Sequence, residues 1–192
     1  MFKKVIFTVS FLAVVGAAAW SAHIVTSPEA IPPQDFVAQA RSLMEQGQKD
    51  QAMSMLQNSL KSGAKNQSVH LLLGELFLEK GDLAQAQAHY GEALKLDAKN
   101  AKAYIGLGLV DIKQQNINGA IQKFTLAMKA DPASADPAYH MGNLALGSGK
   151  PDVAMNFYQK ALQLDPTHNP TLTVVAQMNE LMKKNMGAKG QN

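Results

Sequence analysis

The sequence contains no cysteine, a single tryptophan and no large excess of charge of either sign. The absence of cysteine excludes disulfides, thiol chemistry, cysteine-ligated zinc sites and lipid attachment at an N-terminal cysteine. The formal net charge is +3, and two of the 18 basic residues, Lys3 and Lys4, lie at the very start of the chain. Without these two, 16 basic residues stand against 15 acidic ones. Nucleic-acid-binding proteins carry a clear excess of basic residues, and this chain does not, so we expect no nucleic-acid partner.

The chain also lacks the residue patterns that mark an active site or a metal site. No two of its five histidines lie three or four positions apart, and no constellation of carboxylates accompanies them. There is no glycine-rich phosphate loop, because Gly106 and Gly108 fall inside a predicted helix. The ten methionines are spread over predicted core helices, where methionine fills gaps, and this argues against a copper site. We therefore expect no catalytic residue, no metal and no cofactor.

The histidines are His23, His70, His89, His140 and His168. We expect His70 to be a packed structural residue. His140 is the histidine that could face a binding surface, but a single imidazole is a weak ligand site.

The N-terminal segment has the features of a membrane helix. A positive start, Lys3–Lys4, precedes sixteen uncharged residues, Val5–Trp20, and weakly polar residues extend this stretch to Val25. A helix of such length, 21 residues, rises about 31 Å, which is enough to cross the bilayer core. We interpret residues 1–26 as a single-pass signal anchor and residues 27–32 as a linker. Because the basic residues precede the apolar stretch, we expect a cytoplasmic N-terminus in the bacterial inner membrane and a periplasmic remainder.

Two other interpretations of this segment stay open. Ala17, Ala18 and Ala19 offer a small-x-small cut site, which would make the segment a cleaved signal and the chain a soluble periplasmic protein. The segment could also be a buried helix of a soluble domain. The length of the apolar stretch and the interfacial position of Trp20 favour the retained anchor.

The rest of the chain is organised by a repeat of 34 residues. The stretch Gln67–Asn100 reappears without insertions, so that four copies cover residues 33–66, 67–100, 101–134 and 135–168. The second, third and fourth copies each have a glycine, an alanine, an aromatic residue and a second alanine at fixed positions, and the third and fourth have a proline near their end. These residues are Gly74, Gly108 and Gly142; Ala86, Ala120 and Ala154; Tyr90, Phe124 and Tyr158; Ala93, Ala127 and Ala161; and Pro132 and Pro166. The first copy is degraded, as expected for a terminal repeat.

Each copy predicts two antiparallel helices joined by a tight turn. In the second copy Gly81 can adopt the left-handed conformation that ends a helix, and Asp82 can cap the next one. The turn of the third copy has no glycine, and we expect an asparagine to take this conformation there. The glycine shared by three copies should lie where the two helices cross, because a larger side chain would push them apart.

This pattern resembles the tetratricopeptide repeat (TPR), whose signature has these residue types at these offsets. The resemblance implies an all-α fold, a right-handed α–α superhelix (TPR solenoid) of four helical hairpins, here preceded by the membrane helix or signal segment. Residues 169–186 begin a fifth copy without a second helix and are expected to form a capping helix. Residues 187–192 are expected to be a disordered tail.

The resemblance also implies a binding groove, because the first helices of such repeats line a concave surface. The groove positions are Val37, Arg41, Leu71, Glu75, Leu78, Lys102, Ile105, Leu109, Ile112, Tyr139, Asn143 and Leu146. The positions that correspond to the basic and amide residues with which one branch of the family binds a C-terminal carboxylate hold Leu71, Glu75, Gly106, Asp136 and His140, and none of these matches. The mostly aliphatic set suits an amphipathic helix or an apolar peptide. Alternatively, some of these residues serve packing between repeats or are covered by the capping helix.

From these features we expect a non-enzymatic scaffold or adaptor that is exported and tethered to the inner membrane. It would bind a protein or peptide partner for the assembly or maturation of a membrane or envelope complex, for example in cytochrome c maturation or secretion. The alternative is a permanent structural subunit of a membrane complex, or an array that assembles with copies of itself as a homo-oligomer.

Overall fold

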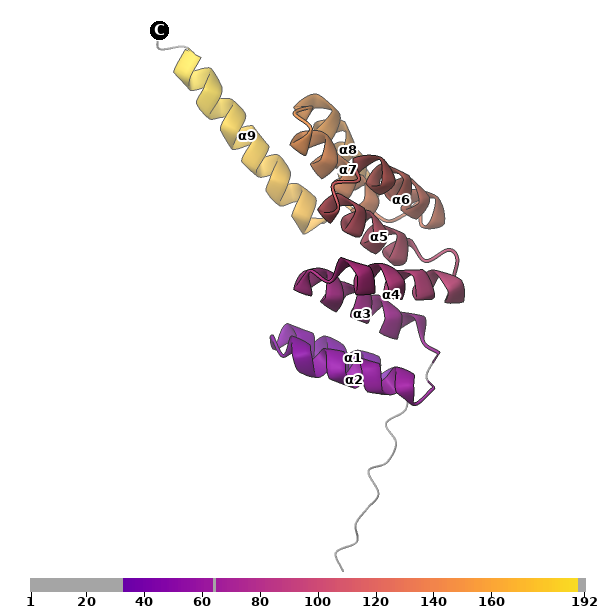
Figure 1. Cartoon of the computed structure of the whole chain (residues 1–192). Coiled ribbons are helices and arrows are strands. Elements are labelled where there is room, and N and C mark those ends of the chain that lie inside the picture. The colour runs from indigo at the N-terminus through magenta and orange to yellow at the C-terminus, as the bar shows by residue number, and fades with distance from the viewer. Residues whose placement is uncertain (1–32, 64, 190–192) are drawn as a thin grey trace, which may run out of the picture. The chain divides into compact units, whose positions relative to one another are not determined.

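The computed structural model describes residues 33–63 and 65–189, which form nine α-helices and no strand (Figure 1). This confirms the predicted all-α fold. The helices are α1 (Pro33–Glu45), α2 (Lys49–Lys61), α3 (Gln67–Lys80), α4 (Leu83–Leu96), α5 (Ala101–Lys113), α6 (Ile117–Ala130), α7 (Asp136–Gly147), α8 (Pro151–Leu164) and α9 (Asn169–Lys189). The predicted anchor and linker, residues 1–32, lie outside the described residues. No helix within the described ranges is both long and apolar enough to cross a bilayer.

Consecutive helices pack as hairpins, and neighbouring hairpins pack on each other. The closest packing joins α1 with α2, α3 with α4, α5 with α6, and α7 with α8 (Figure 1). The second helix of one hairpin packs on the first helix of the next, as α4 does on α5 and α6 on α7. First helices also meet across repeats, α1 with α3 and α3 with α5. Stability of such an array comes from these stacked neighbours, because one hairpin alone cannot cover its apolar face.

The turns between the helices of a repeat follow the predicted chemistry with one exception. Gly81 ends α3 in the left-handed region at φ 83°, and the Asp82 carboxylate accepts a hydrogen bond of 3.1 Å from the Gln85 amide. In the third repeat the left-handed residue is Gln115, at φ 62°, and the expected asparagine is its neighbour. Asn116 instead caps α6 by accepting a bond of 3.1 Å from the Gly119 amide. The side chain of asparagine is therefore used for capping, and glutamine carries the backbone strain.

The glycine shared by the second, third and fourth repeats lies directly under the aromatic ring of its own hairpin. A Cβ added to any of them would come closer to the ring than real Cβ atoms come to other atoms. The shortest distances from that Cβ to a ring carbon are 2.6 Å for Gly74 and Tyr90, 2.5 Å for Gly108 and Phe124, and 2.4 Å for Gly142 and Tyr158. This is the close crossing that the repeat spacing predicts.

The last helix, α9, has 21 residues and extends three residues beyond the predicted end of the capping helix at Met186. Met178 is buried against Ala154 and Tyr158 of α8. The polar residues of its outer face are exposed, but so are the apolar residues Leu172, Ala176, Leu181 and Met182. The second helix that would cover them in a complete repeat does not follow within the described residues.

Candidate partner-binding surfaces

Three of the predicted groove residues belong to the core of the chain itself. Leu71 and Leu78 on α3 are 6% and 8% exposed, and Ile105 on α5 is 9% exposed. Leu71 and Leu78 are covered because α3 packs against α1, α2, α4 and α5 and is apolar on nearly every side. Ile105 is covered because it packs in one apolar cluster with Phe124 of α6. A partner would thus meet a surface with fewer aliphatic side chains than the sequence predicts.

The accessible groove residues form what we call the first-helix surface. Arg41, Lys102 and Leu146 are exposed, and six others are half-buried, namely Val37, Glu75, Leu109, Ile112, Tyr139 and Asn143. The surface is charged at one end and apolar at the other. Burial raises the pKa of the Glu75 carboxyl above its usual range, while the charges of Arg41 and Lys102 act against this rise. The three charges from α1, α3 and α5 are therefore close enough to interact.

In the fourth repeat this surface is ordered by Tyr139 and Asn143. The ring of Tyr139 contacts the rings of His140, Tyr158 and His168, with centroids 5.2–6.3 Å apart. The Tyr158 hydroxyl donates a hydrogen bond of 2.8 Å to the Asn143 side-chain oxygen.

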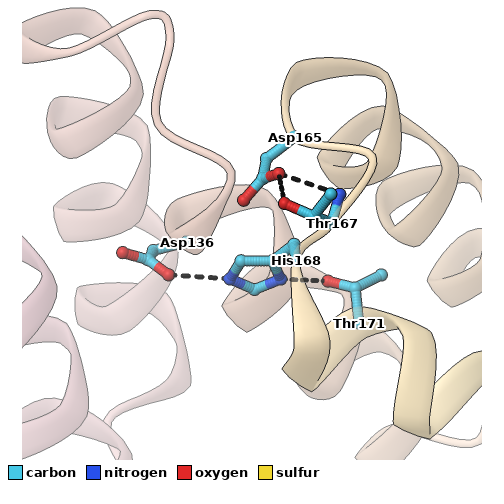
Figure 2. A network of polar contacts seen from close by, with 5 residues as sticks. All are labelled: Asp136, Asp165, Thr167, His168 and Thr171. Carbon is cyan, nitrogen blue, oxygen red and sulfur yellow. Dashed lines mark hydrogen bonds and ion pairs between the residues drawn. The ribbon is translucent and has the colours of Figure 1, made fainter.

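A row of polar groups joins α9 to the start of α7 (Figure 2). His168 Nε2 lies 2.9 Å from Asp136 Oδ1, and His168 Nδ1 lies 2.6 Å from the Thr171 hydroxyl oxygen. With its proton on Nε2, the ring donates to the carboxylate and accepts from the hydroxyl. The row has the residue types of a nucleophilic triad, but Thr171 is fully buried and its hydroxyl cannot meet a substrate. The row therefore acts as a tie that holds α9 on the last repeat.

The structure also brings together two histidines that lie 19 positions apart in the sequence. Nδ1 of His70 on α3 is 3.1 Å from Nδ1 of His89 on α4, and the ring of His89 stacks on Phe77. Burial lowers the pKa of both imidazoles, and for His89 the neighbouring His70 adds to this effect. One neutral ring therefore donates to the other. Within the described ranges no group of three or more histidine, aspartate and glutamate side chains is arranged to hold a metal ion.

A second accessible surface, which we call the α6–α8 groove, has no counterpart in the sequence-based prediction. It is a cavity of about 170 Å³ whose apolar walls come from three helices. They are formed by Ile117 and Ile121 of α6, Met141 and Leu144 of α7, and Val153 and Phe157 of α8. A sequence signal for this groove does exist. The second helices α6 and α8 carry Ile117, Ile121, Val153 and Phe157 at positions where the corresponding residues of the earlier repeats are mostly polar.

Three family models match the chain. One, described as TPR repeat, covers residues 74–111, and two, described as tetratricopeptide repeat, cover residues 37–86 and 135–168. No curated protein matches the chain.

Three solved structures of similar fold have low sequence identity to this chain. TTC0263 of Thermus thermophilus is 19% identical, with a TM-score of 0.70 over 78% of this chain and 82% of that one. The pilF protein of Pseudomonas aeruginosa is 19% identical, with a TM-score of 0.67 over 82% of this chain and 72% of that one. YrrB, described as a TPR protein with an unusual peptide-binding site, is 18% identical, with a TM-score of 0.58 over 76% of this chain and 75% of that one. At such identities the likeness establishes the fold alone, a TPR solenoid.

Proposed function

Since this chain belongs to the tetratricopeptide repeat family, we propose that it is an adaptor that holds a protein partner beside a membrane. The fold is that of a protein–protein interaction scaffold, and proteins of this fold bind protein or peptide partners. TPR proteins are typically not enzymes. The proposed adaptor binds its partner at one defined surface, is tethered to a membrane and assists the assembly of a complex.

The observation that carries the proposal is the accessible first-helix surface. It offers Arg41, Glu75 and Lys102 at one end and Ile112, Tyr139 and Leu146 toward the other, so it suits a peptide with a charged part and an apolar part. YrrB, which has this fold, is described as having a peptide-binding site, and this supports a peptide or a protein segment as the partner. The partner expected here is more polar than the apolar segment that the sequence predicts.

The tether rests on the sequence of residues 1–26, where a basic start precedes a long apolar stretch. We propose that this segment anchors the chain in the inner membrane and places the repeats in the periplasm, where they assist the assembly or maturation of an envelope complex. A full-length chain that stays with membranes after a high-salt wash and keeps its first residues supports the anchor. A mature N-terminus near Trp20 contradicts it.

Site-specific photo-crosslinking in living cells tests the binding role. A crosslinker at Ile112 or at Leu146 should capture one protein, while a crosslinker at the exposed second-helix residue Gln163 should not. Capture from all three positions, or from none, contradicts binding at the first-helix surface. If the captured protein also co-purifies in a fixed ratio after a salt wash, the chain is a permanent subunit and the adaptor proposal is wrong.

A further inference from the structure

The apolar character of the α6–α8 groove is particular to one junction between repeats. Its walls at the junction of the third and fourth repeats hold Ile117, Ile121, Val153 and Phe157. The same positions at the junction of the second and third repeats hold Leu83, Gln87, Gly119 and Lys123, and at the first junction they hold Lys49, Met53, Gln85 and His89. The fold therefore does not require apolar residues here, because the other two junctions form with mostly polar ones.

The groove leaves large apolar side chains in contact with water. Ile117, Ile121 and Val153 are 41%, 38% and 43% exposed, although they lie beside one another around the same cavity. Scattered exposed apolar residues are ordinary, but a contiguous group marks an interaction site. A cavity of about 150 Å³ lined by such residues binds benzene, so the 170 Å³ here can accept one phenylalanine or leucine side chain.

The polar groups at the edge of the groove favour a negative charge in the partner. Among the residues that line it, Lys150 is the charged one, while the Ser148 hydroxyl donates internally to the Leu144 carbonyl oxygen at 2.8 Å. Both α6 and α8 begin beside the groove, and their N-terminal ends add positive potential. Asp152, exposed in the first turn of α8, offsets part of it.

We propose that the α6–α8 groove receives an amphipathic helix of the partner protein. One phenylalanine or leucine of that helix enters the cavity, and an aspartate or glutamate one turn away faces Lys150. Residues three or four apart share one face of a helix, so both contacts can form together. This inference rests on the proposed function, that the chain binds a protein partner, and adds a second contact surface to it.

Two occupants from the chain itself fit the groove less well. The apolar N-terminal segment has no acidic residue before Glu29, so it has no carboxylate to offer Lys150. The exposed apolar end of α9 in a second copy carries Leu181 and Met182, but it also brings Lys183 and Lys184 close to Lys150. Lys183 also forms an ion pair of 3.2 Å with Glu180, so the carboxylate nearest to these apolar residues already has a basic partner.

Isoleucine methyl NMR of the full-length chain tests the proposal, because Ile117 and Ile121 line the α6–α8 groove, whereas Ile112 belongs to the first-helix surface and the buried Ile105 lies in the same apolar cluster as Ile112. The probe is a synthetic amphipathic peptide with one phenylalanine on its apolar face and a glutamate four residues away. It should shift the methyl signals of Ile117 and Ile121 and leave those of Ile105 and Ile112 unchanged. A scrambled peptide of the same composition should shift none. Replacing the phenylalanine with alanine should weaken binding by about tenfold or more.

Charge reversal sharpens the test. Lys150→Glu should weaken binding of the glutamate peptide and restore binding of a peptide with lysine in its place. Ile121→Glu should abolish binding, while the matched variant Gln87→Glu, at the same position of the preceding junction, should leave it unchanged. Both variants lie at exposed positions, and the native spectrum checks their fold. No shift at about 1 mM peptide, or shifts confined to Ile105 and Ile112, would overturn the proposal.

The remaining outcomes separate this inference from the proposed function. If the chain alone dimerises and Ile121→Glu makes it monomeric, the occupant is a second copy and the proposal is wrong. If Ile121→Glu leaves partner capture at Ile112 and Leu146 intact, the groove is not part of the partner interface and the adaptor role stands. If capture at those positions falls with Ile121→Glu but not with Gln87→Glu, both proposals are supported.

Discussion

The ring of Tyr90 on α4 lies against Gly106 on α5, so that a Cβ on Gly106 would come within 2.3 Å of the ring carbon Cζ. Tyr90 also covers Gly74 of its own hairpin, and it is 2% exposed. One aromatic residue thus holds the two helices of a repeat together and joins that repeat to the next. The position equivalent to Gly106 in the fourth repeat is His140, whose ring stacks on Phe124 at 5.2 Å. The junction accepts either a glycine under a tyrosine or a flat ring beside a phenylalanine.

This contact predicts that alanine at Gly106 destabilises the protein although alanine is the better helix former. Overpacking against the buried ring should cost about 1–3 kcal/mol, which exceeds the gain of about 1 kcal/mol in helix propensity. Gly91 on α4 is the matched control, because nothing lies within 4 Å of an added Cβ there. Gly91→Ala should stabilise the protein by about 0.5–1 kcal/mol. Urea denaturation of both variants measures the difference, and a change of the same sign in both would contradict the packing at Gly106.

The left-handed Gln115 predicts a stabilising substitution. A non-glycine residue in this conformation costs about 1–2 kcal/mol, which exceeds the entropy that a glycine adds to the unfolded chain. Gln115→Gly should therefore raise the free energy of unfolding by about 0.5–1 kcal/mol. Gln114→Gly, at φ −84°, should lower it by a similar amount. Thermal melting compares the two, and a lower melting temperature for Gln115→Gly would show that the turn differs from the one described.

Three half-buried histidines predict that the protein loses stability in mild acid. Burial lowers the pKa of His140 below its usual value of 6.5; the Asp136 carboxylate opposes this shift and His168 adds to it. The unfolded chain then binds more protons than the folded one, so stability is complete above pH 6.5 and falls as pH drops toward the folded pKa. Because burial also lowers the pKa of His70 and His89, His140→Phe should remove only part of the loss.

Urea midpoints at about pH 7.5 and about pH 5.5 measure this dependence. At the higher pH His140→Phe should be as stable as the parent chain, since phenylalanine can also stack on Phe124. An equal loss of stability in both proteins on acidification would show that His140 titrates in the folded state as it does in the unfolded one.

The His168 tie predicts that α9 loosens when the imidazole is removed. His168→Ala leaves the fully buried Thr171 hydroxyl without its nitrogen partner, and loss of such a bond costs about 1–3 kcal/mol. Amide hydrogen exchange in α9 should quicken while exchange in α3 stays the same. Thr167→Ala removes an exposed hydrogen bond of 2.7 Å from the Thr167 hydroxyl to the Asp165 carboxylate, and it should have the smaller effect. Unchanged exchange in α9 after His168→Ala would mean that other contacts hold this helix.

Burial predicts which substitutions can test partner binding at the first-helix surface without unfolding the chain. Leu71→Glu places a carboxylate in the core, where an unpaired charge should cost about 3 kcal/mol or more. Leu146→Glu changes an exposed position and should cost about 0.5 kcal/mol or less. Circular dichroism melts decide between them, and equal melting temperatures would contradict the burial of Leu71. Loss of partner capture with Leu146→Glu then reports on binding, whereas loss with Leu71→Glu does not.

The sequence alone determined the features that depend on a local rule repeated every 34 residues. The glycine beneath each ring, the left-handed Gly81 and the capping Asp82 all follow from the spacing of residue types within one hairpin. Even the wrong expectation in the third turn was an error of one position, since Asn116 prefers to cap and leaves the strain to Gln115.

Only the tertiary structure decided which side chains stay accessible. Leu71 and Leu109 both occupy predicted groove positions, yet Leu71 is buried by neighbouring helices and Leu109 is half-buried. The contact between His70 and His89, the tie of His168 to Asp136 and the α6–α8 groove likewise arise where separate helices meet. Exposure depends on the packing of both neighbouring repeats, and a pattern read along one helix does not contain that information.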